Sequence, residues 1–337
     1  MPKLRLSFIS AFNERVDPLM KGTVEAEGIE IVPTYSHPSE TFWRQLKFQE
    51  FEVGEMSMSS YLIARERGFD MIALPVFPSR RLFHTELSYN TDSGVKEPSD
   101  LVGKRIGVGE YQQTAALWQR GILEHDFGVS QYKVHWYMER TEELSHGGAT
   151  GFTPPTGISF QRIPPDKSMA SMLVNNELDA AAINSPWKNM PNIIGRSHLI
   201  SGAGGDWSKV KTLFPDRLAE GKRFFQKWGF LPVNHAYTIR GDIYKKYPWV
   251  AFNLYTGFVK AKEQFNVKLI DSIPSALFFG REYLAITQEM FGNDPYPYGV
   301  KANQKMIQTL IDFSHEQGLT SKKMPIEELF AQSTLGL

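Results

Sequence analysis

Apolar and polar positions follow two different periods along the first third of the chain. Apolar residues at alternate or consecutive positions predict strands at residues 4–9, 29–35, 51–56 and 71–76. Between the second and third of these, Phe42, Trp43 and Leu46 recur at helical spacing. Strands that alternate with helices are typical of an α/β domain with a parallel sheet. We therefore expect such a domain at the start of the chain.

After Pro78 the pattern changes to an extended crossover at 83–90 and then returns to alternating elements. Strands are expected at 104–108, 133–137, 179–184 and 236–239, and helices at 113–127, 169–178 and 304–317. Residues 145–157 are rich in Gly, Thr and Pro, which predicts a loop. This order predicts a first lobe, residues 1–85 and 230–337, that is interrupted by a second, residues 86–229. Ligands of α/β folds bind at the carboxyl ends of strands, so we expect the ligand cleft between the lobes.

Composition and charge exclude several classes of protein. Of the 337 residues, 37 are Lys or Arg and 37 are Asp or Glu, so no net charge favours nucleic acid. Cysteine is absent, which excludes disulfides, thiolate metal sites and cysteine nucleophiles. No apolar run is long enough to cross a membrane, and the N-terminus starts with a short strand pattern instead of a signal peptide. We therefore expect a cytoplasmic protein with no membrane partner.

Polar side chains follow the third and fourth predicted strands. Ser57 and Ser59 stand where a strand meets a helix, and their hydroxyls with the free N–H groups of the helix suit an anion. Each serine alone could equally be a helix cap. Arg80 and Arg81 follow two prolines and are placed to grip a carboxylate, although most arginines lie on solvated surfaces. His84 is either an acid/base or a hydrogen-bonded wall residue.

Two further segments carry candidate ligand contacts. After the strand at 104–108 a short glycine-containing loop presents backbone N–H groups. The candidates in and after this loop are Glu110, Tyr111, Gln112 and Thr114. The segment at 232–235 and the proline-flanked aromatics near the C-terminus add Asn234, His235, Tyr296 and Tyr298, with a well-packed surface turn as the alternative for the tyrosines.

Motifs for cofactors and metals are missing. Neither the phosphate-loop pattern nor Gly-x-Gly-x-x-Gly occurs, and no two histidines have metal-ligand spacing. Gly-x-Ser-x-Gly is absent as well, so serine hydrolysis has no support. A metal site assembled in three dimensions from Glu55, His84, Glu110 and His235 is the alternative, but we expect neither a metal nor a cofactor.

Several segments resemble the 4,5-dihydroxyphthalate decarboxylase family. They are Glu-Met-Ser-Met-Ser-Ser-Tyr-Leu-Ile-Ala-Arg at 55–65, Pro-Val-Phe-Pro-Ser-Arg at 75–80, Gly-Val-Gly-Glu-Tyr-Gln-Gln-Thr-Ala-Ala-Leu-Trp at 107–118, Leu-Pro-Val-Asn-His at 231–235 and Asp-Pro-Tyr-Pro-Tyr-Gly at 294–299. The resemblance spans nearly the whole chain. It implies an α/β, two-lobed fold of the periplasmic-binding-protein type II kind. It also implies cofactor-independent, non-oxidative decarboxylation of a dihydroxylated aromatic acid such as 4,5-dihydroxyphthalate.

The chain departs from the family pattern at two places. Phe83 stands where the family has an arginine before the histidine, and Asn184–Trp187 stands where the family offers Arg-Pro. One charge that grips the ligand is therefore missing or replaced, and Arg81 is the candidate replacement.

The reaction that the resemblance implies needs a clamp for the anion, a base for the phenol and an acid for the ring carbon, and we assign these roles to the candidates. The clamp for the substrate anion is expected from Arg80, Ser57, Ser59 and the helix start at Thr114. His84 or His235 would take the phenol proton, and Glu55 or Glu110 would be the acid.

Two other readings predict the same fold. The first is a non-catalytic binding protein that delivers a small organic anion to an ABC transporter. The acidic candidates argue against it, because a carboxylate binder gains little from acidic groups in its site. The second, a biosynthetic enzyme of the thiamine-precursor type, lacks the expected cysteines and histidines. Trp207, Trp228 and Trp249 would suit the interface of a homo-oligomer.

Overall fold

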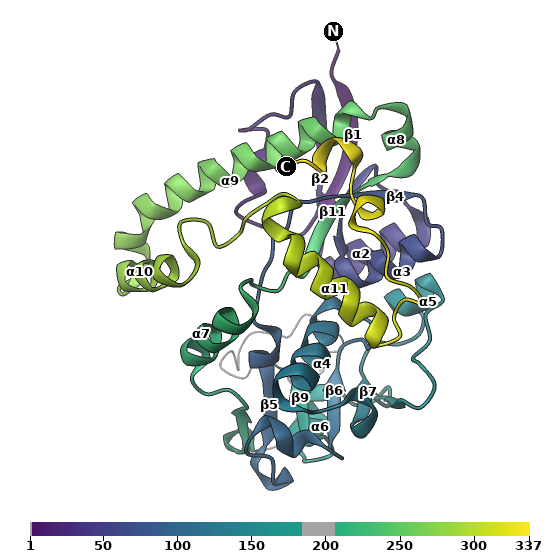
Figure 1. Ribbon diagram of the computed structural model, residues 1–337, viewed down its shortest axis with the longest axis vertical. Helices are drawn as coiled ribbons and strands as arrows, with labels where there is room; N and C mark the ends of the chain where they lie inside the picture. The colour runs from purple at the N-terminus through teal and green to yellow at the C-terminus, as the bar shows by residue number, and fades with distance from the viewer. Residues whose placement is uncertain (1, 184–205) are drawn as a thin grey trace. The chain divides into compact units, whose positions relative to one another are not determined.

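The computed structural model describes residues 2–183 and 206–337 (Figure 1). The chain divides into two compact units. The first comprises Met1–Arg80, Gly229–Thr309 and Met324–Leu337, and the second comprises Arg81–Trp228 and Leu310–Lys323. The lobe boundaries expected above, after residues 85 and 229, stay a prediction, and residues 310–323 are grouped here with the second unit.

A five-stranded sheet in the order β2-β1-β3-β11-β4 forms the centre of the first unit. Its strands are β1 (Leu4–Ser10), β2 (Ile29–Tyr35), β3 (Val53–Ser57), β4 (Met71–Leu74) and β11 (His235–Arg240). The strands of the first third of the chain run parallel, as predicted, because β1 pairs parallel with β2 and β3, and β3 and β4 both pair antiparallel with β11. The antiparallel insertion of β11 between β3 and β4 brings a distant segment next to the end of β3.

The helices of the first unit connect and cover these strands. They are α1 (Asp17–Met20), α2 (Pro38–Phe48), α3 (Met58–Glu66), α8 (Gly241–Lys246), α9 (Trp249–Ala276), α10 (Gly280–Phe291) and α12 (Ile326–Leu329). The helix α11 (Gln304–Glu316) contributes residues to both units. The helix α3 starts directly after β3, with Ser57 at its N-cap position.

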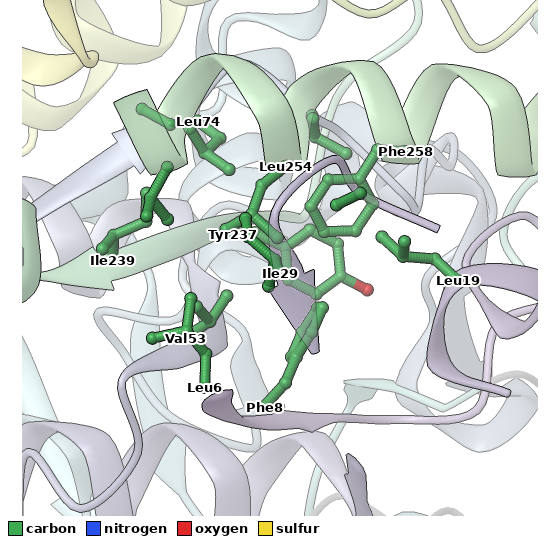
Figure 2. Packing of buried hydrophobic residues seen from close by; sticks show 14 of the residues in the cluster. Leu6, Phe8, Leu19, Ile29, Val53, Leu74, Tyr237, Ile239, Leu254 and Phe258 are labelled. Carbon is green, nitrogen blue, oxygen red and sulfur yellow. The ribbon is translucent and has the colours of Figure 1, made fainter. Parts of the chain in front are cut away.

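The core of the first unit lies between the sheet and α9 (Figure 2). Leu254 and Phe258 of α9, four residues apart on one face, are fully buried against Phe8 and Tyr237 of the strands. The Tyr237 and Phe258 rings stack with centroids 4.6 Å apart. Each such side chain contributes about 1.5–3 kcal/mol on burial, so this contact holds β11 in its place.

A six-stranded sheet in the order β10-β5-β9-β6-β7-β8 forms the centre of the second unit. Its strands are β5 (Leu87–Asn90), β6 (Arg105–Val108), β7 (His135–Met138), β8 (Ser159–Arg162), β9 (Ala180–Ala182) and β10 (Val210–Thr212). The strands β6, β7, β8 and β9 run parallel, and β5 is antiparallel to β9 and β10. The helices are α4 (Thr114–Phe127), α5 (His146–Thr150), α6 (Met169–Val174) and α7 (Arg217–Trp228).

The loop predicted for residues 145–157 contains α5, so that prediction was wrong in part. Ser145 caps this short helix by accepting a hydrogen bond from the Gly148 N–H. A cap supplies a partner for an unpaired N–H group and so offsets the low helix propensity of two glycines.

The two departures from the family pattern have different outcomes. Phe83 is fully buried in the second unit, where its carbonyl accepts a hydrogen bond from Gln119. Asn184–Trp187 lies outside the described residues. Among the helices that are described, none is long and apolar enough to span a membrane.

Candidate functional site

A carboxylate–imidazole pair lies on the two central strands of the first unit. Tyr237 of β11 stands opposite Glu55 of β3, and His235 stands opposite Ser57. Residues two apart on a strand point to the same face, so all four side chains share one face of the sheet. The His235 Nδ1 atom lies 2.6 Å from Oε1 of Glu55. Both side chains are largely buried, which excludes most of the water that would weaken their interaction.

The second oxygen of Glu55 is held by β1 and the residue after it. Oε2 accepts hydrogen bonds from the Ala11 N–H at 2.9 Å and from the Ser10 hydroxyl at 3.3 Å. The Ser10 hydroxyl also lies 2.9 Å from the Tyr237 hydroxyl. Burial, together with the charge of Glu55, raises the pKa of Tyr237 well above its usual value, so its phenol stays neutral. These contacts fix the carboxylate that orients His235.

The predicted serine cluster lies at the carboxyl end of β3. The Ser57 and Ser59 hydroxyls are 3.4 Å apart, and both residues are buried. Ser57 is at the N-cap of α3, a helix of nine residues, so the positive end of the helix dipole lies beside these hydroxyls. This environment favours an anion.

Arg80 binds groups of its own unit. Its guanidinium donates to the Leu231 carbonyl at 3.0 Å, the Pro297 carbonyl at 2.8 Å and the Asn303 amide oxygen at 2.5 Å. Burial lowers the pKa of Arg80 to about 10. These bonds tie together three segments that are distant in the sequence. They give Arg80 a structural role, and the anion grip expected of it stays a prediction.

The remaining candidates of the first unit surround these residues. The backbone of Asn234 bonds to Ser79 and Met58, so this residue holds the start of β11 to its neighbours. The Arg15 guanidinium lies 3.5 Å from the centre of the Tyr296 ring. The Tyr298 ring is buried, and its hydroxyl has no partner among the described residues. Burial raises the pKa of Tyr298 above its usual value.

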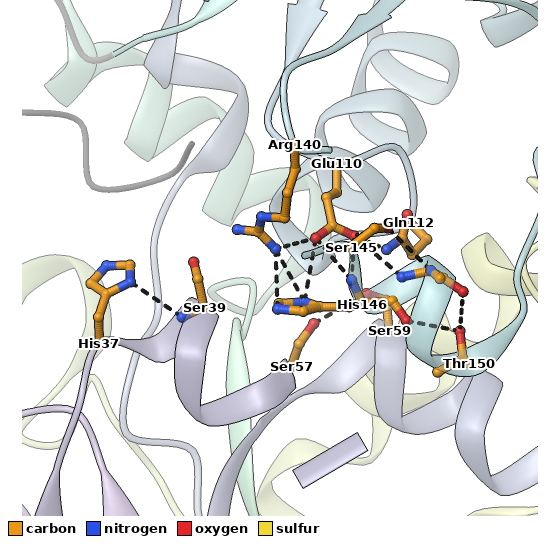
Figure 3. Close-up of polar contacts among 12 residues, drawn as sticks. His37, Ser39, Ser57, Ser59, Glu110, Gln112, Arg140, Ser145, His146 and Thr150 are labelled. Carbon is orange, nitrogen blue, oxygen red and sulfur yellow. Dashed lines mark hydrogen bonds and ion pairs between the residues drawn. The ribbon is translucent and has the colours of Figure 1, made fainter. Parts of the chain in front are cut away.

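The second unit holds a polar cluster around Glu110, at the carboxyl ends of β6 and β7 (Figure 3). Glu110 is fully buried and accepts hydrogen bonds from the Arg140 guanidinium and from the Gln112 amide. It also accepts from the His146 N–H at 3.1 Å and from the Ser145 hydroxyl at 3.2 Å. The His146 ring lies against the same arginine, with Nε2 3.1 Å from Nη1.

The charge state of Glu110 follows from these partners. Burial alone would raise its pKa, but His146, Arg140 and the backbone N–H outweigh burial and hold the pKa below its usual value. Glu110 is therefore ionised at neutral pH and serves better as an anchor for Arg140 and His146 than as a proton donor.

Tyr111 and Thr114 lie in the buried part of the second unit. The Tyr111 hydroxyl donates to Gln131 at 2.6 Å, and the Arg120 guanidinium lies 3.8 Å from the centre of its ring. Thr114 is the first residue of α4 and is almost fully buried. Arg81 pairs at 3.2 Å with Glu86, and its side chain is partly exposed.

His84 belongs to a hydrogen-bonded network around Glu220 in the second unit. Its Nε2 lies 2.5 Å from Glu220, which also binds Arg223 of the same helix at 2.7 Å. Burial lowers the pKa of His84, although Glu220 acts in the opposite direction. Burial would raise the pKa of Glu220, but Arg223 and His84 lower it to about 2. The pair thus joins α7 to the segment before β5.

We expect the contribution of His84 to the unfolding free energy to decrease by about 1 kcal/mol when the pH is lowered from 7.5 to 5.5. The pKa of His84 is lower in the folded protein than its value of 6.5 in the unfolded chain. Such a histidine stabilises the folded protein at a pH above 6.5, and this stabilisation is lost as the pH falls towards the pKa of the folded protein. Glu220 stays ionised throughout, because its pKa is about 2.

Urea unfolding of wild type and His84→Gln at several pH values measures this difference. His125→Gln is the matched control, since His125 pairs at 2.8 Å with Glu316 at a partly exposed position of the same unit. An equal pH dependence in wild type and His84→Gln would contradict the prediction.

Several residues of these clusters were missed from the sequence, Ser145 among them. Arg140 and His146 follow the strand predicted at 133–137. Ligands of α/β folds bind at the carboxyl ends of strands, and this rule could have identified both residues. Ser10 and Tyr237 are ordinary strand residues, and only the pairing of β1, β3 and β11 brings them to Glu55. Within the described part of the chain, no group of three or more His, Asp or Glu side chains is placed to hold a metal ion.

Comparisons with known proteins place this chain among enzymes. It is 29% identical over 338 residues to the 4,5-dihydroxyphthalate decarboxylase of Comamonas testosteroni, which covers 99% of this chain and 98% of that protein. It is 35% identical over 215 residues to the 4,5-dihydroxyphthalate decarboxylase of Pseudomonas putida, which covers 62% of this chain and 83% of that protein. No family model matches the chain.

Solved structures support the fold. The periplasmic aliphatic sulphonate binding protein SsuA of Escherichia coli matches with a TM-score of 0.52 at 13% identity, over 98% of this chain and 92% of that one. The alkanesulfonate-binding protein SsuA of Xanthomonas axonopodis pv. citri, bound to MOPS, matches with a TM-score of 0.51 at 13% identity, over 99% and 97%. The predicted periplasmic-binding-protein-like fold is thus confirmed. With the sequence identities above, the chain belongs to the 4,5-dihydroxyphthalate decarboxylase family of carboxy-lyases.

Proposed function

We propose that this carboxy-lyase converts 4,5-dihydroxyphthalate into protocatechuate and carbon dioxide without a cofactor. The names of its two relatives support the substrate class. The observation that carries the proposal is the buried Glu55–His235 pair, 2.6 Å apart, next to a serine cluster suited to an anion. A pair of this kind moves protons, which is the chemistry that the reaction requires.

The substrate supplies its own electron sink. Each carboxylate of 4,5-dihydroxyphthalate lies para to a hydroxyl, so ionising that hydroxyl increases the electron density at the carbon that bears the carboxylate. A proton then forms a bond to this carbon, and the bond to the carboxylate breaks. The electron pair of the broken bond returns to the ring and restores aromaticity as carbon dioxide leaves. The balance therefore needs no oxidant, reductant or organic cofactor.

His235 is the proposed base for the phenol. Glu55 holds its Nδ1 atom and so orients the ring, which leaves Nε2 for the proton transfer. As the phenol loses its proton, the imidazolium that forms is stabilised by the buried carboxylate. The same imidazolium is then the proposed acid for the ring carbon, so His235 carries the proton in both steps. The phenolate that is left takes up a proton from water, which completes protocatechuate.

Recognition of the substrate carboxylates is proposed for the groups beside the Glu55–His235 pair. Ser57, Ser59 and the N-terminus of α3 offer hydroxyl and N–H donors to an anion.

Decarboxylation in D₂O tests this function directly. Purified protein is incubated with 4,5-dihydroxyphthalate, with and without a chelator, while carbon dioxide release and ring absorbance are followed. We expect turnover in both samples and one deuterium at the carbon that lost its carboxylate. Phthalate, which has no hydroxyl to ionise, is the matched control and should not react. Binding without turnover would instead favour a solute-binding protein, and turnover that the chelator abolishes would contradict the cofactor-free mechanism.

A further inference from the structure

The loop that follows β1 carries an arginine at the carboxyl end of the sheet of the first unit. The shape of this loop is fixed by Asn13, whose side-chain oxygen accepts a hydrogen bond from the Arg15 N–H at 3.0 Å. The amide group of Asn13 donates to the Pro78 carbonyl, after β4, at 3.1 Å. Because β1, β3 and β4 run parallel, their carboxyl ends lie at the same end of the sheet. Arg15 is therefore held at the end where His235 starts β11.

The Arg15 guanidinium is stacked on an aromatic ring. Its carbon lies 3.5 Å from the centre of the Tyr296 ring and 5.3 Å from the centre of the Phe265 ring. A guanidinium that pointed an N–H group at the Tyr296 ring would place its carbon farther away, so the 3.5 Å distance requires the two planes to stack. Stacking covers one face of the cation and leaves the N–H groups at its rim directed away from the ring.

The segment that carries the Tyr296 ring is itself held in place. Lys262 of α9 donates to the Tyr296 carbonyl at 3.0 Å. Arg80 donates to the carbonyl of the next residue, Pro297, at 2.8 Å. The structural role of Arg80 thus includes fixing the ring on which Arg15 lies. A guanidinium that is placed in advance loses less entropy when it binds a ligand.

The rim of the guanidinium is available to a ligand. Among the residues that the structure describes, the half-buried side chain of Arg15 has neither a hydrogen-bond nor an ion-pair partner. Asp17, two residues along the chain, pairs with Lys21 at 2.7 Å. Asp294, in the segment that carries the ring, pairs with Lys262 at 2.5 Å. Two parallel N–H groups of a guanidinium match the two oxygens of a carboxylate, so this arginine suits a carboxylate ligand.

The charge of Arg15 acts on the buried phenols that lie towards the Glu55–His235 pair. Burial raises the pKa of Tyr298, and the Arg15 charge opposes this effect. Burial and Glu55 raise the pKa of Tyr237, and Tyr298 adds to this effect. Such charge effects fall off within about 10 Å at ordinary ionic strength. One intervening phenol therefore connects the cation to the residues around Glu55.

We propose that Arg15 binds the carboxylate that stays on the substrate ring when carbon dioxide leaves. This inference rests on the proposed function, which gives the substrate two carboxylates. Ser57, Ser59 and the N-terminus of α3 then take the departing carboxylate, beside His235. Arg15 makes the site selective for an aromatic dicarboxylate over an aromatic monocarboxylate.

Isothermal titration calorimetry with two ligands that are not substrates of the proposed reaction tests this assignment. Phthalate carries both carboxylates, and protocatechuate, the proposed product, keeps only the carboxylate assigned to Arg15. Arg15→Gln should weaken the binding of both ligands by at least about 10-fold, because it removes charged hydrogen bonds to that carboxylate. Arg15→Lys keeps the charge but cannot stack or present two parallel N–H groups, so it should recover only part of the affinity.

Arg44→Gln is the matched control for the loss of a stacked arginine. The Arg44 guanidinium also lies over a ring, with its carbon 5.0 Å from the centre of Phe51, but its N–H groups already bind Glu40 and Glu50. This variant should bind both ligands as wild type does. Circular dichroism checks that each variant is folded.

Steady-state kinetics separates this role from the chemistry. Arg15→Gln should raise KM for 4,5-dihydroxyphthalate at least about 10-fold and leave kcat within about three-fold. The reason is that a carboxylate that stays on the ring is bound equally in the ground state and in the transition state.

The outcomes distinguish this inference from the proposed function. Unchanged affinity of Arg15→Gln for both ligands would overturn the inference, as would a wild type that binds neither. A loss of affinity for phthalate alone would also overturn it, because Arg15 would then hold the departing carboxylate. A wild type that binds both ligands through Arg15 but does not decarboxylate 4,5-dihydroxyphthalate would support the carboxylate site and refute the proposed function.

Discussion

Exchange of Glu55 for Gln is expected to lower kcat by about 10²- to 10⁴-fold, with a much smaller change in KM for 4,5-dihydroxyphthalate. The carboxylate accepts from the Ala11 N–H and the Ser10 hydroxyl at one oxygen and holds His235 Nδ1 at the other. An amide has only one accepting oxygen. Glutamine must therefore present its NH₂ either to the Ala11 N–H or to His235, and in either case the charge that stabilises the imidazolium is lost.

Steady-state kinetics across the pH range, with substrate binding measured separately, checks this expectation. Glu52→Gln is the matched control, because Glu52 lies just before the same strand and accepts a hydrogen bond from the Ser7 N–H at 2.7 Å without contacting a histidine. It should alter stability and leave kcat within about three-fold. If Glu55→Gln also keeps kcat within three-fold of wild type, His235 does not act as the oriented base.

The sequence predicted the strands that carry Glu55 and His235, but it did not predict that these two strands pair. Glu55 lies in the middle of β3 and His235 at the start of β11, and periodicity places the bounds of both strands within two residues. Their contact depends on the antiparallel insertion of β11 between β3 and β4. Hydrophobic pattern specifies which face of a strand is buried, but it does not specify the neighbour with which the strand pairs. A partner 180 positions away could therefore not be inferred.

The roles of the charged candidates could not be predicted, because the sequence does not show which charged side chains are buried against partners in the protein. Arg80 and His84 follow a strand, and the sequence does not show that one is bonded to Leu231, Pro297 and Asn303 and the other to Glu220. His146 shows the opposite error, because it belongs to a polar cluster but was not predicted as a candidate. It lies in a glycine-rich segment for which a loop was expected. There a single cap by Ser145 was enough to order one helical turn beside Glu110.

Replacing Arg140 by Leu should lower the unfolding free energy by about 3–5 kcal/mol at pH 7.5. Glu110 is fully buried and ionised, and Arg140 supplies a charged partner for it. Leucine keeps much of the volume but leaves the carboxylate with fewer compensating groups. Urea unfolding measures the loss. Lys209→Met is the control, because Lys209 pairs with Asp92 at an exposed position of the same unit and its loss should leave the unfolding free energy close to that of wild type.

Acidification should narrow the difference between Arg140→Leu and wild type. In wild type the pKa of Glu110 is depressed, so its contribution to stability is present above the unfolded value near 4.5 and is lost as the pH falls through the folded value. In the variant Arg140 no longer lowers that pKa, while His146 still does, so the pKa of Glu110 is higher than in wild type and protonation relieves part of the penalty of the less compensated charge as the pH falls. The double variant Arg140→Leu, Glu110→Gln should recover stability at pH 7.5 for the same reason. The loss of unfolding free energy in Arg140→Leu could instead be independent of pH and unchanged by Glu110→Gln. That result would mean that lost packing, and not the unpaired carboxylate, destabilises the variant.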